Sequence, residues 1–267
     1  MRYRTTPILL PTILLCSLFA TISPIDAQQA SSAQSTISSA LNGMKATTWK
    51  QREAAFGKAA QLLGNEEVSA NDKEQVRLSI IQLLVHENSG GLKEPEQPQQ
   101  NYGEGYGEDK AEYYVSLIEF VADLNDERAI PALLGATGSG GIAIRAVVGF
   151  GKKALNPTLD QVRNSDPYLA SDALLVVREM LITHSVDDAD SNLQIKNALR
   201  AALRSPEYHV RENAIDPIEY LVDRKEFIPL LQDIAQHDLY NVPRADGTGR
   251  VYVVRARAQL LLRKIIN

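Results

Sequence analysis

Apolar residues recur at intervals of three and four from about Thr47 onward, and this periodicity limits the possible folds more than any other property of the chain. Two of the stripes are Leu117–Phe120–Val121–Leu124 and Leu174–Val177–Met180–Leu181. This spacing places apolar side chains on one face of an α-helix, whereas a half-buried strand needs strict alternation. No stretch keeps such an alternation. The sequence therefore predicts an all-α fold.

The predicted helices come in pairs with a recurring signature. The first helix of a pair carries a small or medium apolar residue near its start, at Ile118, Ala146, Ala173, Ala214 and Ala258. The second helix opens with a proline two residues before a leucine, at Pro131, Pro157 and Pro229. Proline suits the first turn of a helix, where its missing N–H would have no intrahelical partner. Each of these prolines is therefore expected to mark the start of a second helix.

Short motifs join the pairs. An apolar residue followed by arginine comes before or near the start of a first helix, at Arg77, Arg145, Arg211 and Arg255, and the turns read Ser165–Asp166–Pro167 and Ser205–Pro206. We expect these arginines to bond to neighbouring turns or acidic groups. With the proline starts, these motifs resemble the HEAT-repeat family, in particular the short bacterial type of the phycobilin lyases. The resemblance implies an α-solenoid of stacked antiparallel helical hairpins, a HEAT-like superhelix, over residues 47–267, whose concave face binds other macromolecules.

The first 27 residues have the layout of a secretory signal peptide. A basic start precedes the apolar run Ile8–Ile22, and Ala27 offers a small residue for cleavage before Gln28. The alternatives are a membrane anchor, for which the run is short, and lipidation of Cys16. We expect an exported protein, periplasmic or secreted, with no membrane span after cleavage. Because Cys16 is the single cysteine, the mature chain would have no thiol.

A segment of low complexity follows the leader. Residues 28–46 begin with a stretch rich in Gln, Ser and Ala. Such a composition is typical of a flexible tether, so the folded part is expected to start at residue 47.

A long acidic segment at residues 87–110 interrupts the helical pattern. It is rich in Gly, Pro, Gln and Glu and longer than a plain connector, and residues 87–127 contain eleven acidic side chains against two lysines. Tyr102, Tyr106, Tyr113 and Tyr114 lie within it or directly after it. Tyrosine suits an interface because it offers rigid contact area with a polar tip. These four tyrosines are candidate partner-binding residues. The alternatives are a solvated loop without a partner and a segment that collects calcium.

A second interruption spans residues 237–250 and precedes a closing helix expected at residues 251–266. Its candidate partner-binding residues are Tyr240, Arg244 and Arg250, and the closing helix carries only basic charges. This basic end could meet the acidic segment of a second copy, so self-association is an alternative. The simpler interpretation is a solvated helix face with favourable charges near its C-terminus.

The remaining polar residues form no recognisable catalytic or metal set. Asp188-x-Asp190 begins like a calcium loop, but leucine stands where glycine and glutamate are needed, and Asp190 or Ser191 is expected to cap a helix instead. Gly138-x-Gly140 lacks the preceding strand of a dinucleotide site and is expected to form a tight turn. The four histidines lie far apart. We therefore expect no catalytic residue, no metal and no cofactor.

The sequence as a whole predicts an exported, non-catalytic scaffold that binds a protein or peptide through its concave face and the acidic insertion. The net charge of −5 argues against nucleic acid as a partner. The alternative that the resemblance implies is an enzyme that handles a small molecule, such as a bilin lyase.

Overall fold

The structure is a computed structural model that describes residues 24–92, 106–245 and 247–266. In these residues the α-helices are α1 (Pro24–Gly43), α2 (Trp49–Gly64), α3 (Ala70–His86), α4 (Tyr106–Asp123), α5 (Ile130–Gly135), α6 (Gly141–Gly149), α7 (Lys152–Val162), α8 (Pro167–Ile182), α9 (Ala189–Ala202), α10 (Tyr208–Ile215), α11 (Ile228–His237) and α12 (Val253–Ile266). Short helical turns join several of them, namely η1 (Glu87–Gly91), η2 (Glu127–Ala129), η3 (Thr137–Ser139), η4 (Asp216–Tyr220) and η5 (Arg224–Phe227). The prediction of an all-α fold is confirmed.

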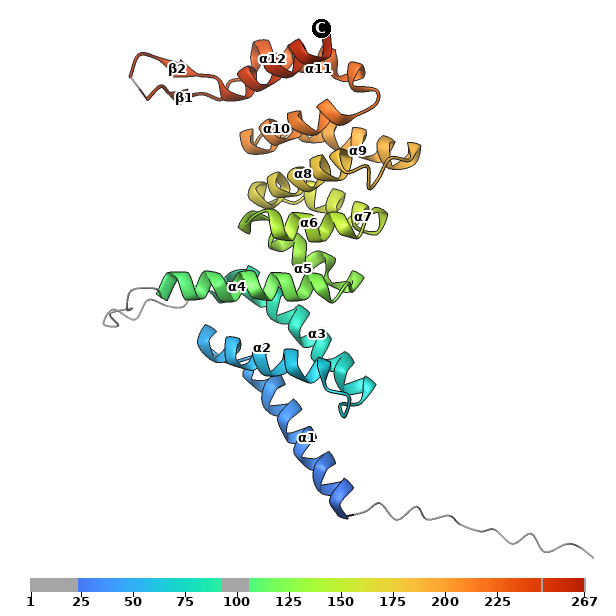
Figure 1. Cartoon of the computed structure of the whole chain (residues 1–267). Helices are drawn as coiled ribbons and strands as arrows, with labels where there is room; N and C mark the ends of the chain where they lie inside the picture. The colour runs from blue at the N-terminus through green and yellow to red at the C-terminus, as the bar shows by residue number, and fades with distance from the viewer. Residues whose placement is uncertain (1–23, 93–105, 246, 267) are drawn as a thin grey trace, which may run out of the picture.

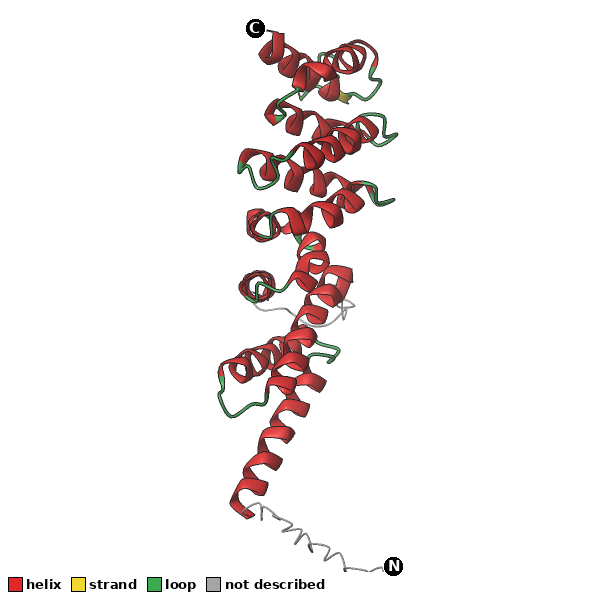
Figure 2. Ribbon diagram, turned by 90° about the vertical axis from the view of Figure 1, so that its right-hand side faces the viewer, coloured by secondary structure: helices red, strands yellow, loops and turns green. Residues whose placement is uncertain are grey.

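The helices follow one another along one long axis, from α1 at one end to α12 at the other (Figure 1). From α4 to α12, each even-numbered helix contacts the next one, and α3, α5, α7 and α9 contact one another in the same way. The two rows also contact each other, for example where α7 packs on α8. The side view shows the same extended outline (Figure 2). Each helix therefore buries its apolar face mainly against its near neighbours.

The repeated small and apolar positions of the sequence all fall in the even-numbered row. Ile118, Ala146, Ala173, Ala214 and Ala258 lie in α4, α6, α8, α10 and α12 respectively. Ala173, Ala214 and Ala258 have no exposed surface, with 0% each. Small side chains at these positions allow a closer approach of neighbouring helix axes.

Capping residues set several helix starts as expected. Asp166 accepts a hydrogen bond from the Tyr168 N–H at 2.9 Å, and Pro167 is the first residue of α8. Pro131 and Pro229 lie in the first turns of α5 and α11. These local signals decide where a helix begins because they satisfy or remove N–H groups that the helix itself leaves unbonded.

The expected start at Pro157 is wrong. Helix α7 begins at Lys152, and Pro157 lies inside it. The chain turns earlier because Gly151 adopts a positive φ of 56°, a conformation that favours glycine. The missing N–H of Pro157 leaves the Lys153 carbonyl without its helical donor, and Lys153 lies on an exposed position where water can bond it.

Residues 28–46 do not form the predicted flexible tether. Most of them belong to α1, which packs on α2. Ile37, Ala40 and Met44 are 2%, 0% and 5% exposed. Apolar residues at helical spacing lie within the polar low-complexity stretch, and α2 supplies the surface that buries them.

Of the predicted signal peptide, residues 1–23 lie outside the described residues. Among the helices that the structure describes, none has the length and apolarity to cross a membrane.

Both interruptions of the helical pattern are partly ordered. Of the insertion at 87–110, η1 takes the first residues and α4 takes the last ones, while residues 93–105 lie outside the described part. The second interruption contains two short antiparallel strands, β1 (Val242–Pro243) and β2 (Arg250–Val251). Strands of two residues are too short to produce an alternating pattern, so the sequence analysis missed them. The closing helix α12 starts two residues later than expected.

Candidate interaction surface

Four aromatic side chains from three segments form a continuous row, which we name the Tyr–His edge: Tyr168, His209, Tyr208 and Tyr240. The ring centroids of Tyr168 and His209 are 5.4 Å apart, and those of His209 and Tyr208 are 3.7 Å apart. Tyr240 stacks on Tyr208 with a centroid distance of 3.4 Å. Tyr168 is 66% exposed. Tyr208, His209 and Tyr240 are half-buried, so the row presents aromatic surface to the solvent mainly through Tyr168.

Helix starts bring these rings together. Tyr168 follows the Asp166–Pro167 cap of α8, and Tyr208 and His209 are the first two residues of α10. The even-numbered helices begin on one side of the molecule, where the β1–β2 hairpin also lies (Figure 1). Residues at equivalent starts of neighbouring helices therefore meet at one edge.

A partly buried ion pair holds the second half of the edge in place. Arg211 donates to both carboxylate oxygens of Asp238, at 2.7 and 3.2 Å, and also to the carbonyls of Ser205 and Pro206. Arg255 donates to the Asp238 carbonyl at 2.5 Å. These bonds position the start of α10 and the residue two before Tyr240.

The prediction that the repeated arginines bond to neighbouring turns or acidic groups is confirmed for Arg211 and Arg255, and Arg77 pairs with Glu74 of its own helix at 3.0 Å. It is wrong for Arg145, which forms no such bond among the described residues.

A groove of about 470 Å³ lies directly beside the edge. The turn before α8 and the turn before α10 form its walls, which include Pro167 and Glu207, the residues that precede Tyr168 and Tyr208. Ala170, Ala198 and Ala202 contribute small apolar side chains, while Arg163 and Arg204 contribute positive charge. The groove and the edge therefore form one surface with aromatic, apolar and cationic parts.

The β1–β2 hairpin follows Tyr240 and carries the sequence-predicted residues Arg244 and Arg250. Both are exposed, and Arg250 bonds to Asn241. Tyr252 follows β2, and the guanidinium of Arg255 lies 4.2 Å from its ring centroid. Tyr240, Arg244 and Arg250 therefore lie in or beside one hairpin, and their role in binding stays a prediction.

The Tyr208 hydroxyl at the edge stays protonated at neutral pH. The hydrogen bond with Tyr240 and burial raise the pKa of Tyr208 to about 12. A protonated hydroxyl can both donate and accept a hydrogen bond. The edge can therefore bond to carbonyl and carboxylate groups of a partner.

Of the four tyrosines of the acidic region, the two whose side chains the structure describes, Tyr113 and Tyr114, are not exposed. Tyr102 lies outside the described residues, and Tyr106 is the first residue of α4. Tyr113 is 2% exposed and belongs to the core, contrary to the exposure expected of a loop. Tyr114 is half-buried and donates to Asn88 at 2.5 Å.

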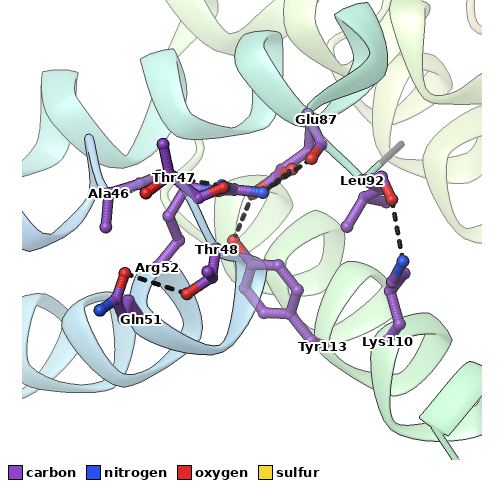
Figure 3. A network of polar contacts seen from close by, with 10 residues as sticks. Ala46, Thr47, Thr48, Gln51, Arg52, Glu87, Leu92, Lys110 and Tyr113 are labelled. Carbon is purple, nitrogen blue, oxygen red and sulfur yellow. Dashed lines mark hydrogen bonds and ion pairs between the residues drawn. The ribbon is translucent and has the colours of Figure 1, made fainter. Parts of the chain in front are cut away.

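Tyr113 takes part in a buried polar network (Figure 3). Arg52 donates to the two carboxylate oxygens of Glu87 at 2.6 and 3.0 Å, and Tyr113 donates to the same carboxylate at 2.9 Å. Arg52 also donates to the Ala46, Thr47 and Gly91 carbonyls. Burial and the nearby Glu87 carboxylate raise the pKa of Tyr113 far above its usual value. The network therefore has a structural role, and Tyr113 is not free to contact a partner.

The calcium-like and the glycine-rich motifs both lie at the start of a helix. Asp188, and not the expected Asp190 or Ser191, caps α9 by accepting from the Ser191 N–H at 3.0 Å. Gly140, with a φ of 122°, makes the expected tight turn before α6. In the described ranges no three His, Cys, Asp or Glu side chains form a potential metal site.

Sequence reasoning missed Tyr168, Tyr208 and His209. The sequence does contain a signal for them, because Tyr168 directly follows the turn at Pro167, and Tyr208 and His209 come two and three residues after Pro206. A search of family models, curated proteins and solved structures finds no match to this chain.

Proposed function

We propose that this protein is an exported, non-catalytic scaffold, a HEAT-like α-solenoid, that binds a protein or peptide through the Tyr–His edge and the groove beside it. The two rows of helices support the solenoid form, since each row repeats the same neighbour contacts. Export rests on the leader-like character of residues 1–27. The acidic insertion and the concave face of the solenoid belong to the same proposal as further contact areas.

The observation that carries the binding function is the aromatic row, in which Tyr168 is exposed and the other three rings are half-buried. Tyrosine and tryptophan dominate the binding free energy of many interfaces because they bury a large rigid area at a low entropic cost. Here three tyrosines and a histidine from α8, α10 and the segment after α11 are held in contact, so the surface is already ordered before a partner arrives. Preorganisation of this kind increases affinity.

The charges around the edge indicate the chemistry of the rim. Arg244 and Arg250 are exposed on the hairpin, and Arg163 and Arg204 line the groove. Arginine makes bidentate bonds to carboxylates. The partner of this surface is therefore expected to place carboxylates around an apolar or aromatic centre.

The proposal is tested by cross-linking the exported protein in its native compartment and identifying the captured species by mass spectrometry. The triple variant Tyr168→Ala/Tyr208→Ala/Tyr240→Ala should capture the main partner at least tenfold less, because removal of interface anchors costs about 2 kcal/mol or more. Circular dichroism should confirm that the variant stays folded.

Tyr220→Ala is the matched control. Tyr220 is also an exposed tyrosine, at 42%, but it ends η4, away from the start of α10. Its replacement should leave the captured species unchanged. Equal capture by the triple variant and the wild type, or an equal loss with Tyr220→Ala, would show that the Tyr–His edge is not the binding surface.

A further inference from the structure

A second groove, of about 630 Å³, lies between α4 and α6. One wall is the C-terminal half of α4, with Glu119, Ala122 and Asp123, and the other is a stripe of α6 that includes Ile142, Arg145 and Gly149. Positions 145, 146 and 149 of α6, and position 150 directly after it, lie three, four, seven and eight residues after position 142. At this spacing the side chains share one face of the helix. One whole face of α6 is therefore turned toward this groove.

The charged groups of this groove have no ion-pair partner among the described residues. Glu119, Asp123 and Arg145 are exposed and form none of the observed salt bridges. Elsewhere, charges on neighbouring elements do pair. Lys153 of α7 reaches Glu127 of η2 at 2.5 Å, and Lys264 of α12 reaches Glu219 of η4 at 2.7 Å. Although α4 and α6 contact each other, the opposite charges on their facing sides are thus left unpaired across the groove.

The floor of the groove is apolar. Ile142, Ala146 and Phe150 are half-buried and pack against the main core. At Gly149 a Cβ atom would meet nothing within 4 Å, so the space above the helix is open at this point. A ligand could therefore bury apolar side chains between the two charged walls.

The dimensions suit a short extended chain. The stripe from Ile142 to Phe150 is about 12 Å long at about 1.5 Å per helical residue. An extended peptide rises about 3.3 Å per residue, so about four residues span this length.

We infer that the α4–α6 groove binds an extended peptide segment that carries lysine or arginine next to apolar side chains. Glu119 and Asp123 would pair with the basic side chains, and the acids at positions 108 and 112 continue the negative charge along α4. Arg145 would bond to backbone carbonyls, and the apolar floor would hold the apolar side chains. This inference rests on the proposed peptide-binding function, but it concerns a different surface from the Tyr–His edge.

The test uses the full exported chain and two fluorescein-labelled hexapeptides in an anisotropy titration. The basic probe has the sequence Ser-Arg-Leu-Arg-Leu-Ser, and the acidic probe has glutamate in place of arginine. The basic probe should bind at least tenfold more tightly than the acidic one, and its affinity should fall as salt is added. Equal affinity for the two probes, or no saturable binding of the basic probe, would overturn the inference.

Two variants address the groove from different sides. Glu119→Gln/Asp123→Asn removes the negative wall, and Gly149→Leu fills the space without a close contact at Cβ. Each should weaken binding of the basic probe at least tenfold. Glu53→Gln/Glu67→Gln, which removes two exposed charges from α2 and the loop after it, should change the affinity less than twofold. Equal effects of the groove and control variants would also overturn the inference.

The two proposals fail separately. The triple tyrosine variant should bind the basic probe like the wild type, and loss of binding there would assign the probe to the Tyr–His edge and refute the groove. Conversely, unchanged partner capture by that variant would refute the edge while the groove titrations still stand.

Discussion

Arg52 places a guanidinium in the core, where the turn before α2, the end of α3 and helix α4 meet. With 1% exposure it bonds to Glu87, which is 3% exposed, and to three backbone carbonyls. Lys110 donates to the Leu92 carbonyl at 2.9 Å on the other side of the insertion. Arg52 and Lys110 therefore join the segments that lie directly before and after residues 93–105.

A buried charge without its partner is costly, and this gives a stability prediction. Glu87→Ala should lower the free energy of unfolding by about 3–5 kcal/mol, because it leaves the Arg52 cation uncompensated in the core. Tyr113→Phe removes one hydrogen bond to a charged group and should cost about 1.5–3 kcal/mol.

Urea denaturation monitored by circular dichroism measures both changes. Glu74→Ala is the control, because Glu74 forms its salt bridges on the surface with Arg77 and Arg128, where ion pairs contribute little. If Glu87→Ala were no more destabilising than the control, the network would not hold this part of the fold.

At the scale of the element, side-chain caps decide where the helices of the stack begin. Asp188 accepts from the Ser191 N–H at 3.0 Å and from the Ser191 hydroxyl at 2.6 Å, and Lys152 lies 3.2 Å away. The bonds from Ser191 are the main reason why the pKa of Asp188 is lowered to about 2. The start of α9 is therefore coupled to pH.

The sign of this coupling follows from the lowered pKa. In the unfolded chain Asp188 takes up a proton near its usual pKa of 3.8, whereas in the folded chain it does so only near 2. Its stabilising contribution is present above about pH 4 and is lost as the pH falls toward 2. Asp188→Asn keeps a capping oxygen but cannot titrate. The variant should therefore lose less stability than the wild type between pH 4 and pH 2, as measured by urea midpoints. If the urea midpoints of the variant and the wild type fell equally between pH 4 and pH 2, the pH-dependent role of Asp188 would be excluded.

At the scale of the whole molecule, stability is spread along a line of neighbour contacts. Trp49 is the only tryptophan of the chain, is 1% exposed and lies in α2 near the N-terminal end. Leu174 is fully buried in α8, toward the other end of the stack. In such an arrangement local stabilities and neighbour interfaces add, so distant parts can unfold separately.

Leu174→Ala should therefore destabilise one part of the stack more than another. The cavity should cost about 2–5 kcal/mol and move the helical circular dichroism transition to lower urea. Tryptophan fluorescence, which reports on Trp49, should keep nearly its wild-type midpoint. Ala173→Gly, which removes a single methyl group next to Leu174, is a milder control. A joint shift of both signals would show that the chain unfolds as one cooperative unit.

The sequence alone was sufficient for the helical class, for the row of positions from Ile118 to Ala258, and for caps such as Asp166–Pro167. These features depend on contacts within about four residues, which the order of residues states directly. Tertiary structure alone decided that α1 is packed, that Tyr113 is buried, and that Tyr168 meets His209. Arg52 and Glu87 are 35 residues apart, and whether they meet depends on which helices lie side by side. Local patterns do not contain that information, because burial and pairing at a distance are set by packing between helices.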